Sequence, residues 1–255
     1  MDAIALSFKD HHAVIELGRP KAHAINREMV DDLREALASL SQADYIRGAI
    51  LTAQGDIFSA GLDVVELYAY DEEQMDRFWE AFGQLMRDMV AFPKPLIAAI
   101  NGHSPAGGCV LALCTDHRIM AGGKFRIGLN EVPVGVVAPG PVVELAAYCM
   151  GHGKASKMLL NGLLMTGEEA LDFGLVDATC PQEEVLLRAE EKLAEWFAYP
   201  DTPWRKTKEI LRRPLVEALS KGAQEAFGET ARAWWSHESR SAMGKFVETL
   251  TSKSN

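Results

Sequence analysis

The sequence predicts an α/β fold in which strands and helices alternate through the first half of the chain. Short apolar and β-branched runs alternate there with segments whose apolar residues recur at helical spacing. After about Val137 helical patterns dominate, and no low-complexity linker separates the two parts. We therefore divide the 255 residues into an α/β core, residues 1–200, and a helical C-terminal region, residues 201–255.

The predicted strands are short runs bounded by polar or turn-forming residues: Ile4–Phe8, Ala13–Leu17, Arg47–Thr52, Pro95–Ile100, His117–Ala121, Lys124–Ile127 and Leu175–Thr179. The predicted helices are Arg27–Leu40, Asp71–Val90, Gly107–Leu113 and the stretch from Thr202 to about Leu250. Phe227, Trp234 and Trp235 form an apolar stripe in that last stretch. Such a stripe is typical of a helix face packed in a core.

Composition excludes several classes of partner. Hydrophobic residues make up 48% and charged residues 24% of the chain, the balance of an ordinary globular protein. The formal charge of −10 argues against non-specific nucleic-acid binding, although a pocket can still be locally positive. No apolar run reaches the ~18–20 residues that span a bilayer. The residues from Met1 to Asp10 do not resemble a secretory signal, so we expect a cytoplasmic protein without a membrane partner.

The cysteines indicate neither a disulfide framework nor a metal site. Cys109, Cys114, Cys149 and Cys180 form no CxxC pair and no Cys/His cluster with zinc spacing. We expect reduced and mostly buried thiols in a reducing compartment, and no bound metal.

Two strand-to-helix junctions are rich in small residues. Residues 55–63 follow the strand Arg47–Thr52, and residues 101–109 follow Pro95–Ile100. Small residues let a ligand approach the backbone, and the first amides of a helix have no partner within it. Two such amides converging on one point would form an oxyanion hole. When either junction is taken alone, ordinary turn chemistry is the better explanation.

Glu131 is the strongest candidate for a proton carrier. No GxSxG, HExxH or Walker A pattern occurs, and His103, His117, His152 and His237 have no evident partners. Glu131 is the only acid in the apolar stretch from Ile127 to Val137. A carboxylate buried there would have a raised pKa suited to proton transfer near neutrality. An exposed loop glutamate remains an equal alternative on these grounds.

Taken together, the motifs resemble the crotonase superfamily. They are Phe58–Asp63, then Asn101-Gly102 with Pro105–Cys109, then Gly128–Glu131. Ser104–Cys109 and Ile127–Glu131 are particularly similar to the mitochondrial-type Δ3,Δ2-enoyl-CoA isomerases. The resemblance covers nearly the whole chain. It implies a core of repeated ββα units with a helical C-terminal trimerisation region, and a homotrimer or a dimer of trimers.

The resemblance also implies the ligand and the site residues. The ligand is an acyl-CoA thioester, so coenzyme A is part of the substrate and no further cofactor is expected. The two oxyanion amides fall on Ala60 and Gly107, and Glu131 carries the proton. The substrate-binding residues are Ala60, Gly61, Leu62, Asp63, Val64 and Gly107, together with Ala22 and Ala24 of a loop that follows Arg19 and Lys21.

Val110 distinguishes between reactions of this family. The hydratases carry a second catalytic glutamate at the position that Val110 occupies here. Adding water requires a held and activated water, whereas moving a double bond requires one base that takes a proton from C2 and returns it to C4. The sequence therefore predicts an enoyl-CoA isomerase that converts a 3-enoyl-CoA to the 2-trans isomer.

Two alternatives remain open at this stage. Hydration or thioester hydrolysis would need an acid from elsewhere, for example Asp63 or Glu66. A non-catalytic acyl-CoA-binding protein would not need the Ala60, Gly107 and Glu131 set. We expect residues between Leu67 and Ala91 to contribute to the wall that limits acyl-chain length.

Overall fold

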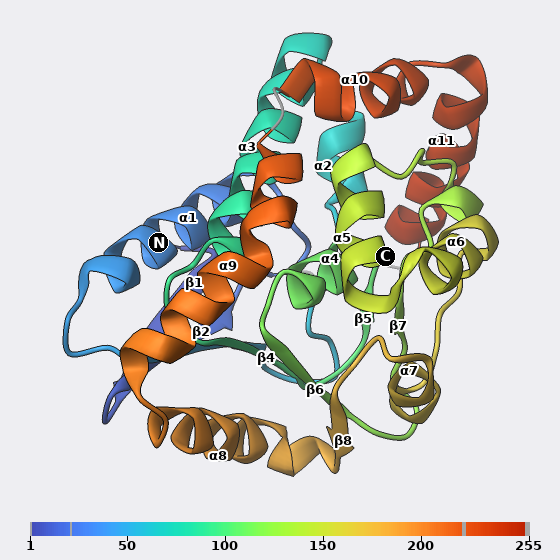
Figure 1. The fold of residues 1–255 in the computed structure, drawn as a ribbon. Helices are drawn as coiled ribbons and strands as arrows, with labels where there is room; N and C mark the ends of the chain where they lie inside the picture. Colours follow the sequence, from blue (N-terminus) through green and yellow to red (C-terminus); the bar gives the residue numbers. More distant parts are fainter. Residues whose placement is uncertain (1, 21, 221–222, 253–255) are drawn as a thin grey trace.

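A central sheet organises the computed structural model, which describes residues 2–20, 22–220 and 223–252 (Figure 1). Within these residues the sheet has six strands in the order β1-β2-β3-β4-β6-β8. The strands are β1 (Ile4–Lys9), β2 (His12–Leu17), β3 (Gly48–Ala53), β4 (Leu96–Ile100), β6 (His117–Ala121) and β8 (Ala178–Cys180). β1 and β2 pair antiparallel, and the other neighbours pair parallel. The predicted α/β fold is confirmed.

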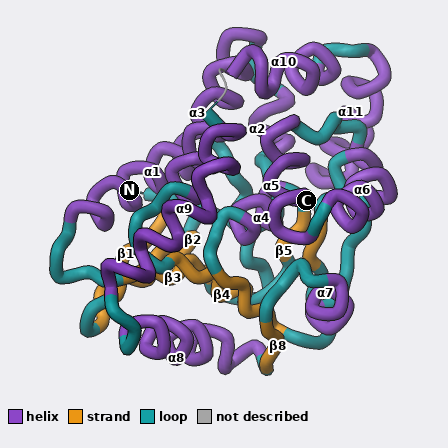
Figure 2. Tube along the Cα trace, viewed as in Figure 1, coloured by secondary structure: helices purple, strands orange, loops and turns teal. Residues whose placement is uncertain are grey.

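Helices cover both faces of this sheet. They are α1 (Arg27–Gln42), α2 (Val64–Tyr68), α3 (Glu72–Val90), α4 (Gly107–Leu113), α5 (Gly140–Met150), α6 (His152–Asn161), α7 (Gly167–Phe173), α8 (Val185–Phe197), α9 (Asp201–Leu219), α10 (Ala223–Trp234) and α11 (His237–Ser252). α8 packs against β3, β4 and β6 on one face, below the sheet in Figure 1. α1, α3 and α9 lie on the opposite side, and Figure 2 shows the helical layer extending away from the strands. Within the described ranges, each helix is too short or too polar to traverse a bilayer.

A set of short pairings, which the sequence did not reveal, joins the loops that follow the main strands. β5 (Ser104–Pro105) pairs with β7 (Ile127–Gly128), and isolated bridges join Ile25 to Leu62 and Ile57 to His103. Single bridges and two-residue strands leave no periodic pattern to detect. They bring the two predicted junctions and the segment before Glu131 side by side.

Most predicted elements match the structure to within two residues at each end, and two predicted strands differ from the structure by more than that. The predicted strand Lys124–Ile127 shares only Ile127 with β7. The predicted strand Leu175–Thr179 becomes β8, which starts at Ala178. Gly174 ends α7 in the left-handed conformation, and the amides of the next two residues then bond back to the Ala170 carbonyl oxygen. Leu175 and Val176, the first residues of the apolar run, therefore belong to the helix cap and not to the strand.

The C-terminal region folds onto its own chain as three helices instead of one continuous stretch. Phe227 and Trp234 are buried against α3, where the Trp79 ring lies 5.4 Å from Phe227 and 6.4 Å from Trp234. The expected core role of the stripe is confirmed for these two residues. Since the same chain covers them, these two residues are not available for contacts with another subunit, and the trimer that the resemblance implies stays a prediction.

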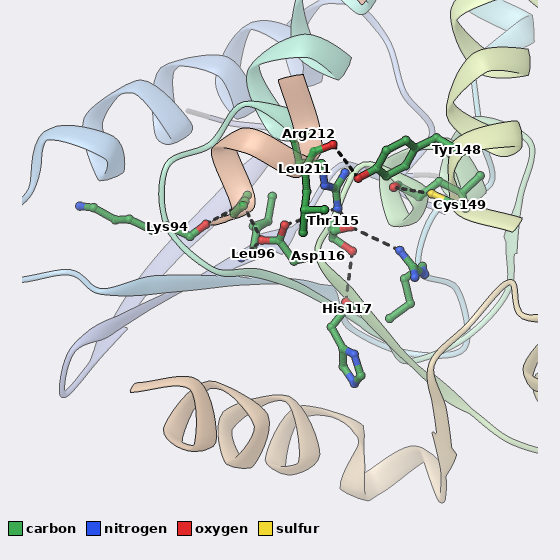
Figure 3. A network of polar contacts seen from close by, with 12 residues as sticks. Lys94, Leu96, Thr115, Asp116, His117, Tyr148, Cys149, Leu211 and Arg212 are labelled. Atoms are coloured by element: carbon green, nitrogen blue, oxygen red, sulfur yellow. Dashed lines mark hydrogen bonds and ion pairs between the residues drawn. The ribbon is translucent and has the colours of Figure 1, made fainter. Parts of the chain in front are cut away.

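A buried ion cluster fastens α9 to the sheet (Figure 3). The Asp116 carboxylate accepts hydrogen bonds from the Leu96 amide at 2.8 Å and from Lys208 Nζ at 2.6 Å. Arg212 Nη2 lies 3.4 Å from the other carboxylate oxygen. All three charged side chains are at least nine-tenths buried. Burial lowers the pKa of Lys208, and Asp116 opposes this effect. Asp116 therefore compensates two cations and ties β4 to α9.

We predict that Asp116→Ala lowers the free energy of unfolding by about 3–5 kcal/mol, because it leaves buried cations without a counter-charge. Equilibrium denaturation in urea measures the change. Glu209→Ala is the matched control, since it removes an exposed ion pair with Lys206 on the same helix. It should leave the transition where it is. A midpoint for Asp116→Ala close to that of the control would contradict the role of the cluster.

Candidate active site

A cavity of about 1010 Å³ collects the predicted site residues from distant parts of the sequence. The following predicted residues line it: Ala22, Ala24, Ala60, Leu62, Asp63, Val64, Gly107 and Glu131. Gly61 is not among the lining residues, but its positive φ of 87° turns the chain between Ala60 and Leu62. Arg19 also lines the cavity, while Lys21 lies outside the described residues.

The first junction offers a different amide from the one predicted. The Ala60 N–H donates to the Ala22 carbonyl oxygen at 3.0 Å, so it is already engaged. This bond contradicts the predicted role of the Ala60 amide as an oxyanion donor. The Leu62 N–H has no hydrogen-bond partner in the described part of the chain, and Leu62 lines the cavity. The predicted donor, Ala60, lies two residues before the free amide of Leu62, because the sequence does not show the hydrogen bond from Ala60 to Ala22.

The second junction lies directly against the first. A Cβ on Gly107 would sit 3.2 Å from the Leu62 nitrogen and 3.3 Å from the Gly61 Cα, so a larger residue would force the two loops apart. The preceding residue, Ala106, has φ 47° and ψ −120°. Such a backbone conformation costs of order 1–3 kcal/mol in a residue other than glycine. The Gly107 N–H begins α4 and has no partner among the described residues. The two free amides therefore lie close together.

Glu131 is buried beside these amides. Its side chain is 8% exposed, and Oε2 has no hydrogen-bond partner among the described residues. The backbone turns here into the short 3-10 helix Val132–Val134, which Gly135 ends in the left-handed conformation. Burial raises the pKa of the Glu131 carboxyl to about 7, and its own backbone amide opposes this slightly. The predicted buried carboxyl is confirmed, and the exposed loop glutamate is wrong. A carboxyl with this pKa can both accept and return a proton near neutrality.

The other two carboxylates lining the cavity are held by a cation. Arg19 Nη1 donates to Asp63 at 2.7 Å, and Arg19 Nη2 donates to Glu66 at 2.8 Å. Asp63 also caps α2 through the Glu66 amide, and Glu66 accepts from Tyr70 at 2.8 Å. Val110 is 1% exposed and lines the cavity together with Glu131. Glu131 is therefore the one lining carboxylate in the described chain that is not in an ion pair.

One part of the cavity is apolar and comes from three helices. α3 contributes Trp79 and Phe82, α5 contributes Val142, and α11 contributes Phe246 and Leu250. Two residues of the stretch between Leu67 and Ala91 therefore line the cavity, and their role in limiting acyl-chain length stays a prediction. The contribution of α11 was missed, although Phe246 and Leu250 stand at helical i,i+4 spacing.

The described part of the chain contains no evident metal-binding site. No three His, Cys, Asp or Glu side chains within it gather so that they could hold a metal ion. The histidines have structural contacts instead. His103 Nδ1 accepts from the Arg126 amide at 3.1 Å, and His117 lies 3.7 Å from Asp177.

Comparisons with known proteins identify the family of the chain. Residues 8–254 match the family model for enoyl-CoA hydratase/isomerase. The mitochondrial enoyl-CoA delta isomerase 1 of Mus musculus is 36% identical over 82% of this chain and 73% of its own length. The human protein of the same name is 34% identical, over 81% and 69%. A probable enoyl-CoA hydratase of Bacillus subtilis is 31% identical, over 78% and 77%.

The fold comparison covers the C-terminal helices as well. The crystal structure of human mitochondrial delta3-delta2-enoyl-CoA isomerase superposes with a TM-score of 0.95 at 29% identity, over 99% of this chain and 100% of that one. The family model, these relatives and the shared fold lead to one conclusion: the chain belongs to the enoyl-CoA hydratase/isomerase family of the crotonase superfamily.

Proposed function

We propose that the protein is an enoyl-CoA isomerase that converts a 3-enoyl-CoA thioester to the 2-trans isomer. The observation that carries the proposal is the lone carboxyl of Glu131, buried without an ion-pair partner and facing a cavity in which Val110 stands where hydratases have an acid. The mitochondrial relatives named as delta isomerases support this reaction.

The substrate carbonyl would bind where the two junctions meet. The Leu62 and Gly107 amides are free to donate, and each belongs to a backbone segment that its neighbours fix in place. When C2 loses its proton, negative charge moves to the thioester oxygen. Two preoriented amides stabilise that charge more than they stabilise the neutral carbonyl, which lowers the barrier. Leu62 therefore replaces Ala60 in the proposed oxyanion hole.

Glu131 would carry one proton between two carbons. Its carboxylate takes the proton from C2, and the electron pair is delocalised through the double bond as a dienolate. The protonated Glu131 then returns the proton to C4, and the double bond comes to rest between C2 and C3. No atom is gained or lost, so a single acid–base group is enough.

The cavity does not favour water addition. Hydration would need a second group to orient and activate a water, but Asp63 and Glu66 are bound to Arg19. Val110 presents only methyl groups to the cavity. The apolar walls from α3, α5 and α11 would surround the acyl chain and keep water from the dienolate.

Further proposals concern the oligomeric state, the cofactor and the location of the enzyme. From the family resemblance we propose a homotrimer or a dimer of trimers. We also propose that coenzyme A enters as part of the substrate and that no other cofactor is used. A cytoplasmic location is likewise a proposal, and the rodent and human relatives are mitochondrial proteins by name.

We predict that Glu131→Gln reduces isomerase turnover by at least about 10²–10⁴-fold, because the amide keeps the shape of the side chain but cannot accept the proton. Binding of the acyl-CoA should persist. Conjugation of a 3-enoyl-CoA, followed by absorbance, measures turnover, and calorimetry measures binding. Glu144→Gln on the exposed side of α5 is the control and should remain fully active. Turnover of Glu131→Gln within about tenfold of the wild type would refute Glu131 as the base.

The pH dependence of kcat/KM should reflect the raised pKa of Glu131. The free enzyme must present the carboxylate, so kcat/KM should rise with pH through about 7 and level off above it. An ordinary exposed glutamate would instead give a rise near 4. Rates measured from pH 5 to pH 9 at low substrate distinguish the two. A profile that is flat across this range would contradict the buried carboxyl as the group that starts the reaction.

We predict that Val110→Glu introduces slow but measurable hydration of a 2-enoyl-CoA, because two carboxyls then flank the bound double bond. Isomerase activity and thermal stability should both fall. The larger side chain overpacks a buried position, which costs about 1–3 kcal/mol, and burial disfavours the new charge. Val110→Gln is the matched control, of equal size but without the carboxyl. Formation of 3-hydroxyacyl-CoA is the readout. Faster hydration than isomerisation by the wild type would overturn the proposed reaction.

A further inference from the structure

A second cavity, of about 560 Å³, lies between the start of β6, the end of α5 and the first half of α9. It shares no lining residue with the catalytic cavity. Cavities of roughly 300–1,000 Å³ are the usual size for small-molecule sites. The proposed proton transfer and the binding of the acyl chain do not involve this second cavity. The charge and aromatic character of its lining therefore need a separate explanation.

Positive charge dominates the lining. Arg118, Lys208 and Arg212 line the cavity together with a single carboxylate, Asp116. Arg118 pairs with a carboxylate outside the lining, that of Asp177, at 2.7 Å. Three cations thus face two carboxylates, in a chain whose formal charge is −10. A locally positive pocket in an acidic protein favours an anionic ligand over the remaining surface.

Two arginine side chains in this lining each have a guanidinium N–H group without a hydrogen-bond partner among the described residues. These groups are Arg118 Nε and Arg212 Nη1. The two residues are only 7% and 8% exposed, and Arg212 Nη2 is already bound to the Thr115 carbonyl oxygen at 2.7 Å. Figure 3 shows the Arg212 guanidinium between Thr115 and the Tyr148 ring. Buried N–H groups of charged side chains are seldom left unpaired, so these two guanidinium groups have hydrogen-bonding capacity to spare, although both nitrogens are enclosed by the protein.

Aromatic rings form the walls of the same cavity. Trp196 and Trp204 lie with ring centroids 5.2 Å apart, and Tyr148 lies under the Arg212 guanidinium at 5.5 Å. Tyr199 completes the rim and is 48% exposed. Flat side chains beside guanidinium groups provide stacking surfaces for a flat ring and donors for an oxyanion.

We propose that this cavity is a second ligand site, which binds a small oxyanion carried on a flat aromatic ring. Carboxylate and phosphate both match the guanidinium donors, so an aromatic carboxylate and a nucleotide are the two sources of this chemistry. The site is independent of the isomerase reaction. It would bind its ligand in a protein whose Glu131 has been replaced.

Titration calorimetry on the full-length protein tests the site with four probes. Benzoate and AMP carry a ring, whereas acetate and inorganic phosphate present the same oxyanions without one. Benzoate or AMP should bind at least about tenfold more tightly than its ringless counterpart, since ring stacking contributes about this much. Preference for benzoate identifies a carboxylate ligand, and preference for AMP identifies a phosphate ligand. The Glu131→Gln protein should give the same values.

Two neighbouring residues of α9 provide a matched pair of variants. Leu211 and Ile210 are both 61% exposed, but Leu211 lines the cavity and Ile210 does not. Leu211→Glu adds a negative charge at the rim without disturbing the buried cluster, and it should weaken binding at least about tenfold. Ile210→Glu should leave binding within about twofold of the wild type. Because AMP could also enter the catalytic cavity, only binding that Leu211→Glu reduces counts as support.

Three results would overturn the proposal. The first is the absence of saturable binding of benzoate and AMP at millimolar concentration. The second is an equal loss of binding in Leu211→Glu and Ile210→Glu. The third is light scattering in which both variants split an oligomer of the wild type, because the surface would then be an interface between copies of the chain.

Discussion

The burial of one carboxyl group, that of Glu131, is the constraint on which the catalytic cavity depends. Removing a carboxylate from water is unfavourable, and among the described residues no cation pairs with Glu131. The surrounding chain must therefore hold the group in place by packing. The 3-10 turn that begins after Glu131, the backbone pairing of β7 with β5, and the cover supplied by α11 all serve this arrangement. The result is a carboxyl whose pKa lies near neutrality, which is the property that reversible proton transfer requires.

Comparing the buried carboxyl of Glu131 with the ion-paired carboxylates distinguishes a group suited to proton transfer from groups that stabilise the fold. The side chain of Asp116 is also largely buried, but it forms ion pairs with Lys208 and Arg212, and it connects β4 to α9. Asp63 and Glu66 lie at the cavity but are fixed by Arg19. Among the described carboxylates that line the cavity, Glu131 is the one without an ion pair, and it is the one to which we assign the proton transfer.

Close backbone contact between the two junctions is the second requirement of the site. Gly107 comes so near to Gly61 and Leu62 that even a Cβ would lie closer to them than in ordinary van der Waals contact, and Ala106 adopts a strained conformation beside it. This strain is stable only because β5 and the Ala106 amide are held by β7 through hydrogen bonds. The C-terminal helices close the other side, since α10 packs its aromatic residues on α3 and α11 lines the cavity.

The sequence by itself determined the features that leave a periodic pattern of apolar residues or place one residue type alone in an unusual context. Apolar periodicity identified the main strands and helices, with α4 and β6 matched residue for residue. The isolation of Glu131 in an apolar stretch identified the carboxyl, and Val110 within a family motif indicated the reaction. Only the tertiary structure decided between the Ala60 and Leu62 amides, because that choice depends on a hydrogen bond to Ala22, 38 residues earlier in the sequence. It alone also showed that Arg19 forms ion pairs with both Asp63 and Glu66, and that α11 lines the cavity. These contacts join segments far apart in the chain, and each depends on the packing of the whole fold, which no local pattern of residues records.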